Sequence, residues 1–357
     1  MKAKKLRRGD AIGIVSLSKG ILGEKFVSHE KELAERRLEN FGFKVKYMDN
    51  ALKGFEYLNE HPEKRAEDLI QAFSDSEVKA IICAIGGDDT YRLTPYLFSD
   101  GRFMELVKKN PKIFLGFSDT TLNHLMLYKC GLNTFYGQSL LADIAELDTE
   151  MLPYSQKYFE KVFIDGSLDV IKSSELWYEE RTDYSEAALG TPRIQHRETA
   201  GFELVNGSGK FRGKVLGGCL ESFGDMLSET LHAEEAEIVS KYGIMPGLDE
   251  WKGKILLLET AECATPPKEF HQILLSMKKT GIFDAVSGII AGKPQNEMYY
   301  EEYKTIYKDV IGSTELPIVY NVNVGHAVPR CIIPFGVELE VDAKENEIRI
   351  LEEILEA

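Results

Sequence analysis

Apolar runs alternate with helical patterns along the first half of the chain. The predicted strands are 11–18, 44–48, 78–87 and 112–117, and the predicted helices lie near 30–41, near 63–73 and after Ser118. In the helical segments apolar residues recur every three to four positions, whereas the strands are short apolar runs. Strands that alternate with helices form βαβ units. The pattern therefore predicts an α/β fold with a mostly parallel sheet and helices on both faces.

The pattern changes in the second half. From Ser173 to Arg212 the sequence is polar, punctuated by glycine and without sustained periodicity, which is typical of a linker or a functional loop. Beyond it, apolar runs, a helix near Pro267–Lys279 and a closing hairpin predict a smaller, mixed α/β domain. We expect three parts: an N-terminal α/β domain at 1–168, an inter-domain linker and substrate loop at 169–212, and a C-terminal domain at 213–357.

Composition narrows the classes of function. The 357 residues are 43% hydrophobic and 28% charged, as in globular proteins of about two domains. A net charge of -15 argues against nucleic-acid binding, because phosphate backbones require clustered Lys and Arg. The basic start is followed by an apolar run too short for a secretory signal, and no run approaches the ~18 apolar residues of a membrane span. We therefore expect a soluble, cytoplasmic protein without a membrane partner.

The cysteines give no sign of a structural bridge or a metal site. There are five of them, an odd number, and none is in C-x-x-C spacing. Buried, reduced thiols are the expected state, with no disulfide framework and no zinc site. The glycine-rich phosphate-binding motifs are also missing. We expect neither a metal nor a cofactor.

Ser118 stands where an apolar run turns into a helical pattern, in the sequence Gly116-Phe117-Ser118-Asp119. A serine at a sharp strand-to-helix turn exposes its hydroxyl, and the helix that follows offers free backbone N–H groups. An attacking alkoxide and the oxyanion that it creates require this environment. Ser118 is therefore a candidate nucleophile. The alternative is a helix N-cap, a place that serine and aspartate both favour.

A glycine pair, Gly86 and Gly87, ends the apolar run 78–87. Glycine permits a tight turn whose amides point at a ligand oxygen. Ligands of parallel sheets bind at the carboxyl ends of the strands, so this turn should lie at the same edge as Ser118. The alternative is that the two glycines only turn the chain.

Two further candidates end apolar runs of the second domain. Glu259 follows one run, at a place suited to an acid that orients a histidine, and Glu262 is a rival for that role. His326 follows another run, where Gly325 and Pro329 impose an irregular backbone. The chain order serine, acid, histidine occurs in one hydrolase fold. Sequence alone does not bring such distant residues into contact.

Six segments, taken in order, resemble the LD-carboxypeptidase family of serine peptidases. They are "AIGGDDTYRLTPYL", "KIFLGFSDTTLNHLMLYKCGLNTFYGQ", "VLGGCLESF", "ILLLETAE", "GIIAGKPQ" and "VGHAVPRCIIPFG". The resemblance spans nearly the whole chain. It implies a parallel-sheet N-terminal domain, a smaller C-terminal domain and a triad at their interface, with Ser118 as nucleophile, His326 as general base and Glu259 as orienting acid.

The resemblance also assigns the groups around the triad. The oxyanion hole is implied to consist of the backbone N–H groups of Gly87 and Asp119, with Gly86 beside the substrate. In the microcin C immunity branch an aromatic loop helps to hold an adenylate, which implies that Trp177 and Tyr178 bind the substrate by stacking on a base. Trp177 could equally pack the seam between the domains. A homodimer is implied as well.

The family has two branches, and the sequence favours one of them. The immunity branch cleaves the amide that joins an amino acid or peptide to a nucleotide-like moiety, and the "ELWYEE" segment resembles its loop. The murein branch trims the D-residue from tetrapeptides and typically has arginine where this chain has Ile85. We therefore expect a hydrolase of microcin C-like compounds, with the murein LD-carboxypeptidase as the alternative. A two-lobed, non-catalytic binding protein is the alternative of another class.

The expected mechanism passes through an acyl-enzyme without a metal. Neutral His326 takes the proton of Ser118 as the hydroxyl attacks an amide carbonyl, and two backbone amides hold the oxyanion. If the pKa of His326 stays near ~6.5, activity should rise through about pH 6–7.

Overall fold

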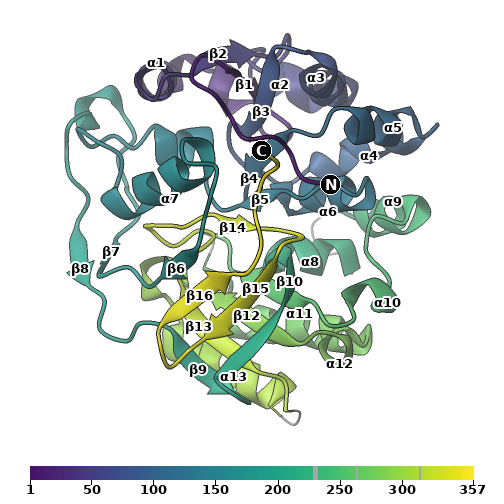
Figure 1. The fold of residues 1–357 in the computed structure, drawn as a ribbon, viewed down its shortest axis with the longest axis vertical. Helices are drawn as coiled ribbons and strands as arrows, with labels where there is room; N and C mark the ends of the chain where they lie inside the picture. The colour runs from purple at the N-terminus through teal and green to yellow at the C-terminus, as the bar shows by residue number, and fades with distance from the viewer. Residues whose placement is uncertain (228–231, 263, 313–314) are drawn as a thin grey trace.

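The structure is a computed structural model. It contains two large β-sheets, one above the other in the view of Figure 1, and helices flank each of them. It describes residues 1–227, 232–262, 264–312 and 315–357. The N-terminal half builds the upper sheet in that view, and the C-terminal half builds most of the lower one. This arrangement confirms the predicted fold class.

The upper sheet has six strands in the order β14-β5-β4-β3-β1-β2. Their bounds are β1 Ala11–Val15, β2 Lys44–Tyr47, β3 Val78–Cys83, β4 Ile113–Gly116, β5 Phe135–Tyr136 and β14 Ile333–Pro334. Strands β1 to β5 pair in parallel, and β14, which comes from the C-terminal half, runs antiparallel to β5. Strands β1 and β4 are wholly buried, and β3, which lies between them, is buried except at Lys79, as continuous apolar runs require.

Helices of the N-terminal half join these strands and cover both faces of the sheet (Figure 1). They are α1 Ser28–Asn40, α2 Phe55–Glu60, α3 Pro62–Ser74, α4 Thr94–Phe98, α5 Arg102–Lys109, α6 Thr120–Lys129 and α7 Pro153–Phe163, with a π-helical turn at Leu140–Ile144. Helix α6 is the one that follows Ser118, and apolar and polar side chains alike are buried along it. It therefore passes through the interior of the protein.

The lower sheet has eight strands in the order β6-β16-β15-β10-β11-β12-β13-β9. Their bounds are β6 Val170–Lys172, β9 Glu203–Asn206, β10 Lys210–Cys219, β11 Ile255–Glu259, β12 Gly288–Gly292, β13 Ile318–Val322, β15 Glu338–Asp342 and β16 Glu347–Ile350. Strands β10 to β13 are parallel, and antiparallel pairs flank them on both sides. The sheet is therefore mixed, as expected.

Helices of the C-terminal half pack against this lower sheet (Figure 1). They are α8 Leu220–Leu227, α9 Glu235–Tyr242, α10 Leu248–Trp251, α11 Pro267–Lys279, α12 Ile282–Ala285 and α13 Tyr300–Ile311. Helix α11 has the bounds that its periodicity predicts.

The segment that looked irregular in the sequence contributes strands to both sides of the lower sheet. Strand β6 pairs with β16, and β9 pairs with β13. Two more short strands, β7 Leu176–Tyr178 and β8 Gln195–Arg197, form a separate two-stranded hairpin. Strands of three or four residues are too short to establish a period of two, so only their pairing partners reveal them.

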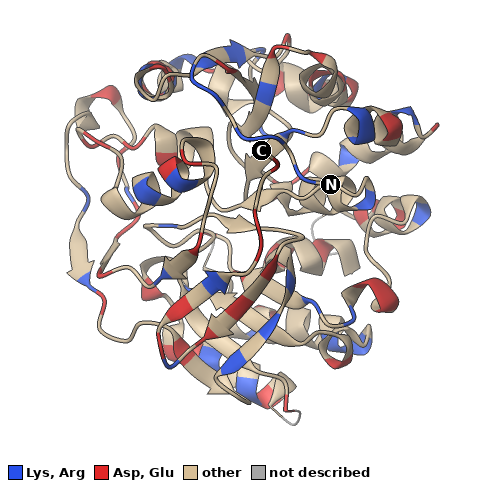
Figure 2. Cartoon of the chain, in the orientation of Figure 1, with Lys and Arg blue, Asp and Glu red and all other residues tan. Residues whose placement is uncertain are grey.

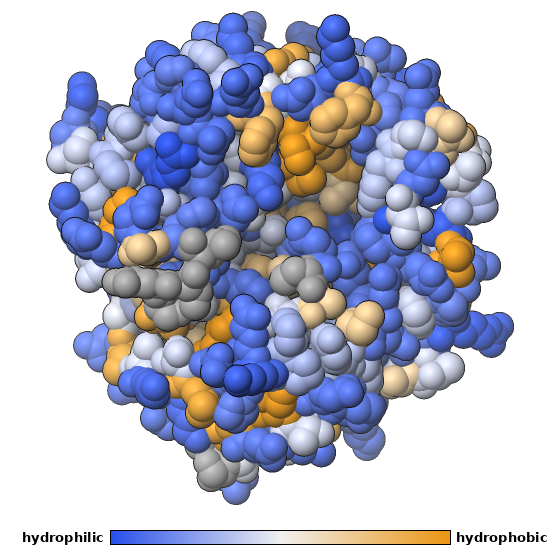
Figure 3. All heavy atoms as spheres, turned by 180° about the vertical axis from the view of Figure 1, so that it is seen from behind, coloured by the Kyte–Doolittle hydropathy of each residue, from blue (hydrophilic) through white to orange (hydrophobic). Residues whose placement is uncertain are grey.

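Charged side chains of both signs are interspersed over the outer helices and strands (Figure 2). On the opposite face most of the surface is hydrophilic, and hydrophobic side chains gather in a recess of the upper half and in smaller patches of the lower half (Figure 3). Among the described helices, none combines the length and apolar character needed to cross a membrane. The four described cysteines are free and buried, as expected, and Cys263 lies outside the described residues.

Candidate active site

Ser118 occupies a strained turn between β4 and α6. Its φ angle is +66°, in the left-handed region that few residues other than glycine adopt. The backbone carbonyl of Ser118 accepts the N–H of Thr121 at 2.8 Å as the helix starts. Strained serines at strand-to-helix turns are typical of nucleophile elbows. The local geometry thus matches the one predicted from the sequence.

Asp119 begins the helix but makes no side-chain capping bond. Its carboxylate instead accepts the backbone N–H groups of Asp89 at 3.1 Å and Thr90 at 3.0 Å. Burial raises the pKa of Asp119 to about 6. The Asp119 side chain therefore holds the loop that follows the glycine pair instead of capping the helix.

The glycine pair lies directly against Ser118. A Cβ atom on Gly86 would lie 2.8 Å from the Ser118 Oγ, and one on Gly87 would lie 2.1 Å from the Oγ of Ser18. Only glycine fits at either position. Within the described part of the chain, the backbone N–H groups of Gly87 and Asp119 donate no hydrogen bond. Two unpaired amides therefore lie near the hydroxyl, as an oxyanion hole requires.

A buried ionic cluster holds this glycine loop from below. The Arg65 guanidinium donates to both carboxylate oxygens of Asp89, at 2.5 and 3.0 Å, and to the carbonyl of Ser18 at 3.1 Å. The Ser18 hydroxyl donates to Asp89 at 3.2 Å and accepts the N–H of Asp88 at 3.1 Å. Burial would raise the pKa of Asp89, but Arg65 and Arg92 outweigh burial and lower it. This cluster could not be predicted from the sequence, because Ser18, Arg65 and Asp89 are far apart in the chain.

Glu259 and His326 meet at the ends of β11 and β13. The Nδ1 of His326 lies 2.7 Å from Glu259 Oε2, and the backbone N–H of His326 donates to the same oxygen at 3.1 Å. Gly325 has a φ of +81°, and a Cβ there would lie 2.1 Å from this carboxylate oxygen. The glycine before the histidine is therefore a requirement of the close approach. Two residues 67 positions apart in sequence form one buried acid–base pair.

Tyr136 links the two halves of the site, and nothing in the sequence pointed to it. Its hydroxyl accepts the backbone N–H of Ser118 at 3.1 Å and donates to Glu259 Oε1 at 2.6 Å. Burial, first, and the neighbouring Glu259 raise its pKa well above the ordinary value, so the phenol keeps its proton. The nucleophile's backbone and the acid's carboxylate therefore share one fixed partner.

The second ring nitrogen of His326 faces a different carboxylate. Its Nε2 lies 3.0 Å from Glu262 Oε2. Among the hydrogen bonds of the described residues, none joins the Ser118 hydroxyl to His326. The Phe117 ring, next to Ser118 in the chain, packs edge-on against the imidazole at 5.0 Å between ring centroids. The structure thus brings all three predicted residues to one site but pairs only two of them.

The two carboxylates change the expected titration. Burial alone would lower the pKa of His326, but Glu259 and then Glu262 outweigh burial and raise it to about 10. The expectation of a pKa near 6.5 is therefore wrong for the ligand-free site. The physical reason is the pair of carboxylates around the ring: Glu259 raises the pKa of His326 most, and Glu262, whose contact with Nε2 was not foreseen, raises it further.

Cys219, Glu259 and His326 form a group whose potential ligand atoms lie within 4.8 Å of one another. These three side chains are poorly suited to bind a metal ion, because their ligand atoms already make hydrogen bonds. The thiol donates to Glu221 at 3.2 Å, and burial, first, raises its pKa well above the ordinary value. Both oxygens of Glu259 already accept hydrogen bonds. A metal would have to replace all of these contacts.

The hairpin of β7 and β8 lies beside the histidine. The backbone N–H of Tyr178 donates to the carbonyl of Val328 at 2.9 Å, two residues after His326. The half-buried Trp177 stacks on His196 with 4.1 Å between ring centroids, and the Lys293 ammonium lies 5.2 Å from its ring. Trp177 thus packs mainly within its own hairpin and against the C-terminal half.

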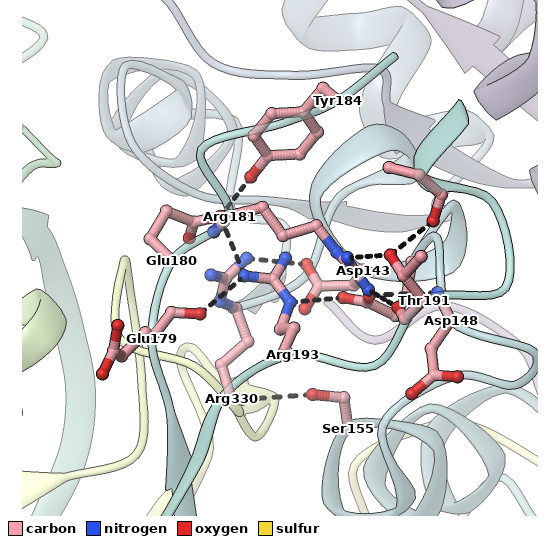
Figure 4. Close-up of polar contacts among 12 residues, drawn as sticks. Asp143, Asp148, Ser155, Glu179, Glu180, Arg181, Tyr184, Thr191, Arg193 and Arg330 are labelled. Carbon is pink, nitrogen blue, oxygen red and sulfur yellow. Dashed lines mark hydrogen bonds and ion pairs between the residues drawn. The ribbon is translucent and has the colours of Figure 1, made fainter. Parts of the chain in front are cut away.

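An ionic network ties this hairpin to both halves of the protein (Figure 4). Glu146 accepts Arg181 at 2.5 Å and Arg193 at 2.6 Å, and Arg193 also donates to Glu180 at 2.9 Å. Arg330 donates to Asp143 at 3.1 Å and to the carbonyl of His326 at 3.3 Å. The loop and the histidine therefore share a rigid, buried support.

Comparison with known proteins places this geometry. The family model of the LD-carboxypeptidase N-terminal domain matches residues 12–137, and that of the LD-carboxypeptidase C-terminal domain matches residues 212–341. The chain belongs to the LD-carboxypeptidase family. It is therefore a serine peptidase of that family, which confirms the resemblance found in the sequence.

Three relatives show the range within the LD-carboxypeptidase family. An MccF-like protein from Streptococcus pneumoniae, solved in complex with AMP, is 53% identical, with a TM-score of 0.94 over 96% of this chain and 99% of that one. The microcin C7 self-immunity protein MccF of Escherichia coli is 27% identical over 82% of this chain and 79% of its own length. A probable murein peptide carboxypeptidase of Bacillus subtilis is 27% identical over 97% of this chain and 92% of its own length.

Proposed function

We propose that the protein hydrolyses the amide bond of aminoacyl- or peptidyl-nucleotide compounds through a Ser118–His326–Glu259 triad and an acyl-enzyme. The observation that carries this proposal is the convergence of a strained serine, two unpaired amides and a buried carboxylate–imidazole pair at one place. Acyl transfer by a serine requires these three elements.

The first half of the reaction forms the acyl-enzyme. The Ser118 oxygen attacks the amide carbonyl while its proton passes to Nε2 of His326, and Glu259, bonded to Nδ1, stabilises the imidazolium. The carbonyl oxygen becomes an oxyanion and accepts hydrogen bonds from Gly87 and Asp119. When the tetrahedral intermediate collapses, the C–N bond breaks and the leaving nitrogen takes the proton from Nε2.

The second half restores the enzyme. Water attacks the acyl carbon and gives a proton to Nε2 of His326. Ser118 then leaves and recovers that proton, which releases the carboxylic acid product. Each proton moves through the same ring nitrogen, so the mechanism requires Nε2 to face Ser118 whenever a substrate is bound.

The nucleotide part of the proposal is supported by similarity. The relative from S. pneumoniae, which matches almost the whole chain at 53% identity, was solved with AMP. In this chain Trp177 lies on the hairpin next to the His326 loop. Stacking of a nucleotide base on an aromatic side chain of this kind contributes ~1–3 kcal/mol of binding free energy. Ile85, an apolar residue, precedes the glycine pair, where the murein branch typically has arginine.

The test uses two substrates in parallel. The purified protein is incubated with an alanyl-sulfamoyl adenosine in one tube and a murein tetrapeptide in another, and products are followed by mass spectrometry. Free sulfamoyl adenosine supports the proposal. Release of only the terminal D-residue would assign the protein to the murein branch, and no release from either would favour a binding protein.

A further inference from the structure

Two carboxylates contact the imidazole of His326, and they are held very differently. Glu259 is buried and fixed by Tyr136, by the His326 backbone and by Nδ1. Glu262 has a side chain that is 67% exposed, and among the described residues its only ion-pair partner is His326. An exposed carboxylate with one contact is easily displaced, because solvent competes for it.

Glu262 occupies the atom that the reaction needs. Nδ1 of His326 is committed to Glu259, so Nε2 is the only nitrogen that can take the proton of Ser118. In the ligand-free structure that nitrogen lies 3.0 Å from Glu262 instead. A ring nitrogen that donates its proton to Glu262 has no lone pair for the proton of Ser118, so Glu262 must move away and Nε2 must lose its proton before the attack begins.

The place of the reacting carbonyl indicates what moves it. The carbonyl carbon must lie next to the Ser118 Oγ, and in an aminoacyl group the α-nitrogen is about 2.5 Å from that carbon. Because Ser118 must pass its proton to Nε2, the substrate's α-ammonium comes close to this nitrogen and therefore to the Glu262 carboxylate, which contacts Nε2 at 3.0 Å. The nearby Lys19 is already paired with Asp88 at 3.3 Å. Among the described residues, the Glu262 carboxylate therefore has no lysine or arginine partner, and it can pair with an incoming ammonium group in place of His326.

We propose that Glu262 is a specificity-determining residue, which holds His326 in the resting site and releases it to a substrate whose acyl group has a free α-ammonium. The inference rests on the proposed function and names its substrate class: aminoacyl compounds with an unblocked amine, in preference to N-acylated ones. Exchange of the protonated imidazole for the ammonium keeps the Glu262 carboxylate paired. The imidazole, which has then lost one of its two anionic partners, releases its Nε2 proton to water, and Nε2 can accept the proton of Ser118.

The experiment compares alanyl-sulfamoyl adenosine with its N-acetyl derivative at neutral pH. For the native protein we expect kcat/KM to favour the free amine at least tenfold. In Glu262→Gln, which keeps the shape and removes the charge, the ratio should fall to within threefold. Glu77→Gln is the matched control, because Glu77 is also an exposed carboxylate, paired with Lys46 at 2.8 Å far from this site; its ratio should stay that of the native protein.

A binding measurement separates this inference from the proposed function. Calorimetry with Ser118→Ala, which retains the binding groups, should show at least tenfold tighter binding of the free amine, and Ser118→Ala/Glu262→Gln should lose that difference. Equal turnover and binding of both compounds would overturn the role of Glu262 and leave the hydrolase intact. Absence of both turnover and binding would overturn both proposals.

Discussion

The two walls of the site are built in opposite ways. The wall from the upper sheet, which contains Ser118 and the glycine pair, is fixed by buried partners: Asp119 and the Arg65–Asp89 cluster hold its loop. The wall from the lower sheet has a movable part. His326 is held by two contacts with the buried Glu259, whereas its contact with Glu262 involves an exposed side chain.

The difference separates two tasks of one enzyme. An oxyanion hole works best when its amides cannot reorganise during the reaction. A general base must change partners when the substrate arrives, so part of its surroundings must give way. We therefore expect changes in the upper wall to lower kcat, and changes near Glu262 to alter substrate choice and pH dependence.

The largest effect should come from removing the nucleophile or the base. Ser118→Ala and His326→Ala should each lower turnover by at least ~10³-fold, because triad members act as a unit. Steady-state assays with alanyl-sulfamoyl adenosine measure the loss. Ser16→Ala, which removes a buried hydroxyl bonded to the Ala51 carbonyl at 2.9 Å, should remain near native activity. A Ser118→Ala protein within tenfold of native would remove Ser118 from the mechanism.

Breaking the support of the glycine loop should have the next largest effect. Arg65→Met leaves the carboxylate of Asp89 buried without its main partner, which costs about 3–5 kcal/mol of unfolding free energy, and kcat should fall about tenfold as the amides of the loop shift. Urea denaturation and kcat are measured together. Arg102→Met is the matched control, because its pair with Asp100 is exposed and contributes only about 0–1 kcal/mol. If Arg65→Met lost stability alone, the cluster would have no part in positioning the amides.

Loss of the shared phenol should have a smaller effect. Tyr136→Phe leaves the backbone N–H of Ser118 and one oxygen of Glu259 without their partner, at about 1–3 kcal/mol, and kcat should fall about fivefold. Tyr158→Phe serves as the control, since it removes another buried hydroxyl, bonded to the Lys172 N–H at 3.0 Å, away from the triad. Equal kcat for the two variants would show that the Tyr136 hydroxyl does not couple the walls.

The smallest expected effect is a shift in the pH dependence of kcat/KM. A base must be neutral, and the pKa of His326 is raised to about 10, so kcat/KM, which reports the free enzyme, should still be rising above pH 8. In Glu262→Gln one of the two carboxylates is gone, and the rise should begin about one pH unit lower. Stopped assays from pH 5 to 10 with both proteins measure the shift. Coincident profiles would exclude Glu262 from the titration.

The sequence was most informative where its pattern was long or local. The bounds of α11 and the strained turn at Ser118 could be predicted, because periodicity and a strand end are properties of neighbouring residues. Tyr136 and the contact of Glu262 with His326 could not, since each joins residues that are far apart in the chain and meet only in the folded protein. The short strands of the 169–212 segment escaped for the same reason.

Strand β14 leaves the C-terminal half shortly after His326 and completes the upper sheet beside β5. The two ends of the described chain are also joined, because Lys5 and Ala3 exchange backbone hydrogen bonds with Glu356 at 2.9 and 2.8 Å. Main-chain hydrogen bonds thus connect the two halves at separate points. Separating the two halves would break main-chain hydrogen bonds at each of these points, so reactants enter and leave the site without a rigid-body opening of the two halves.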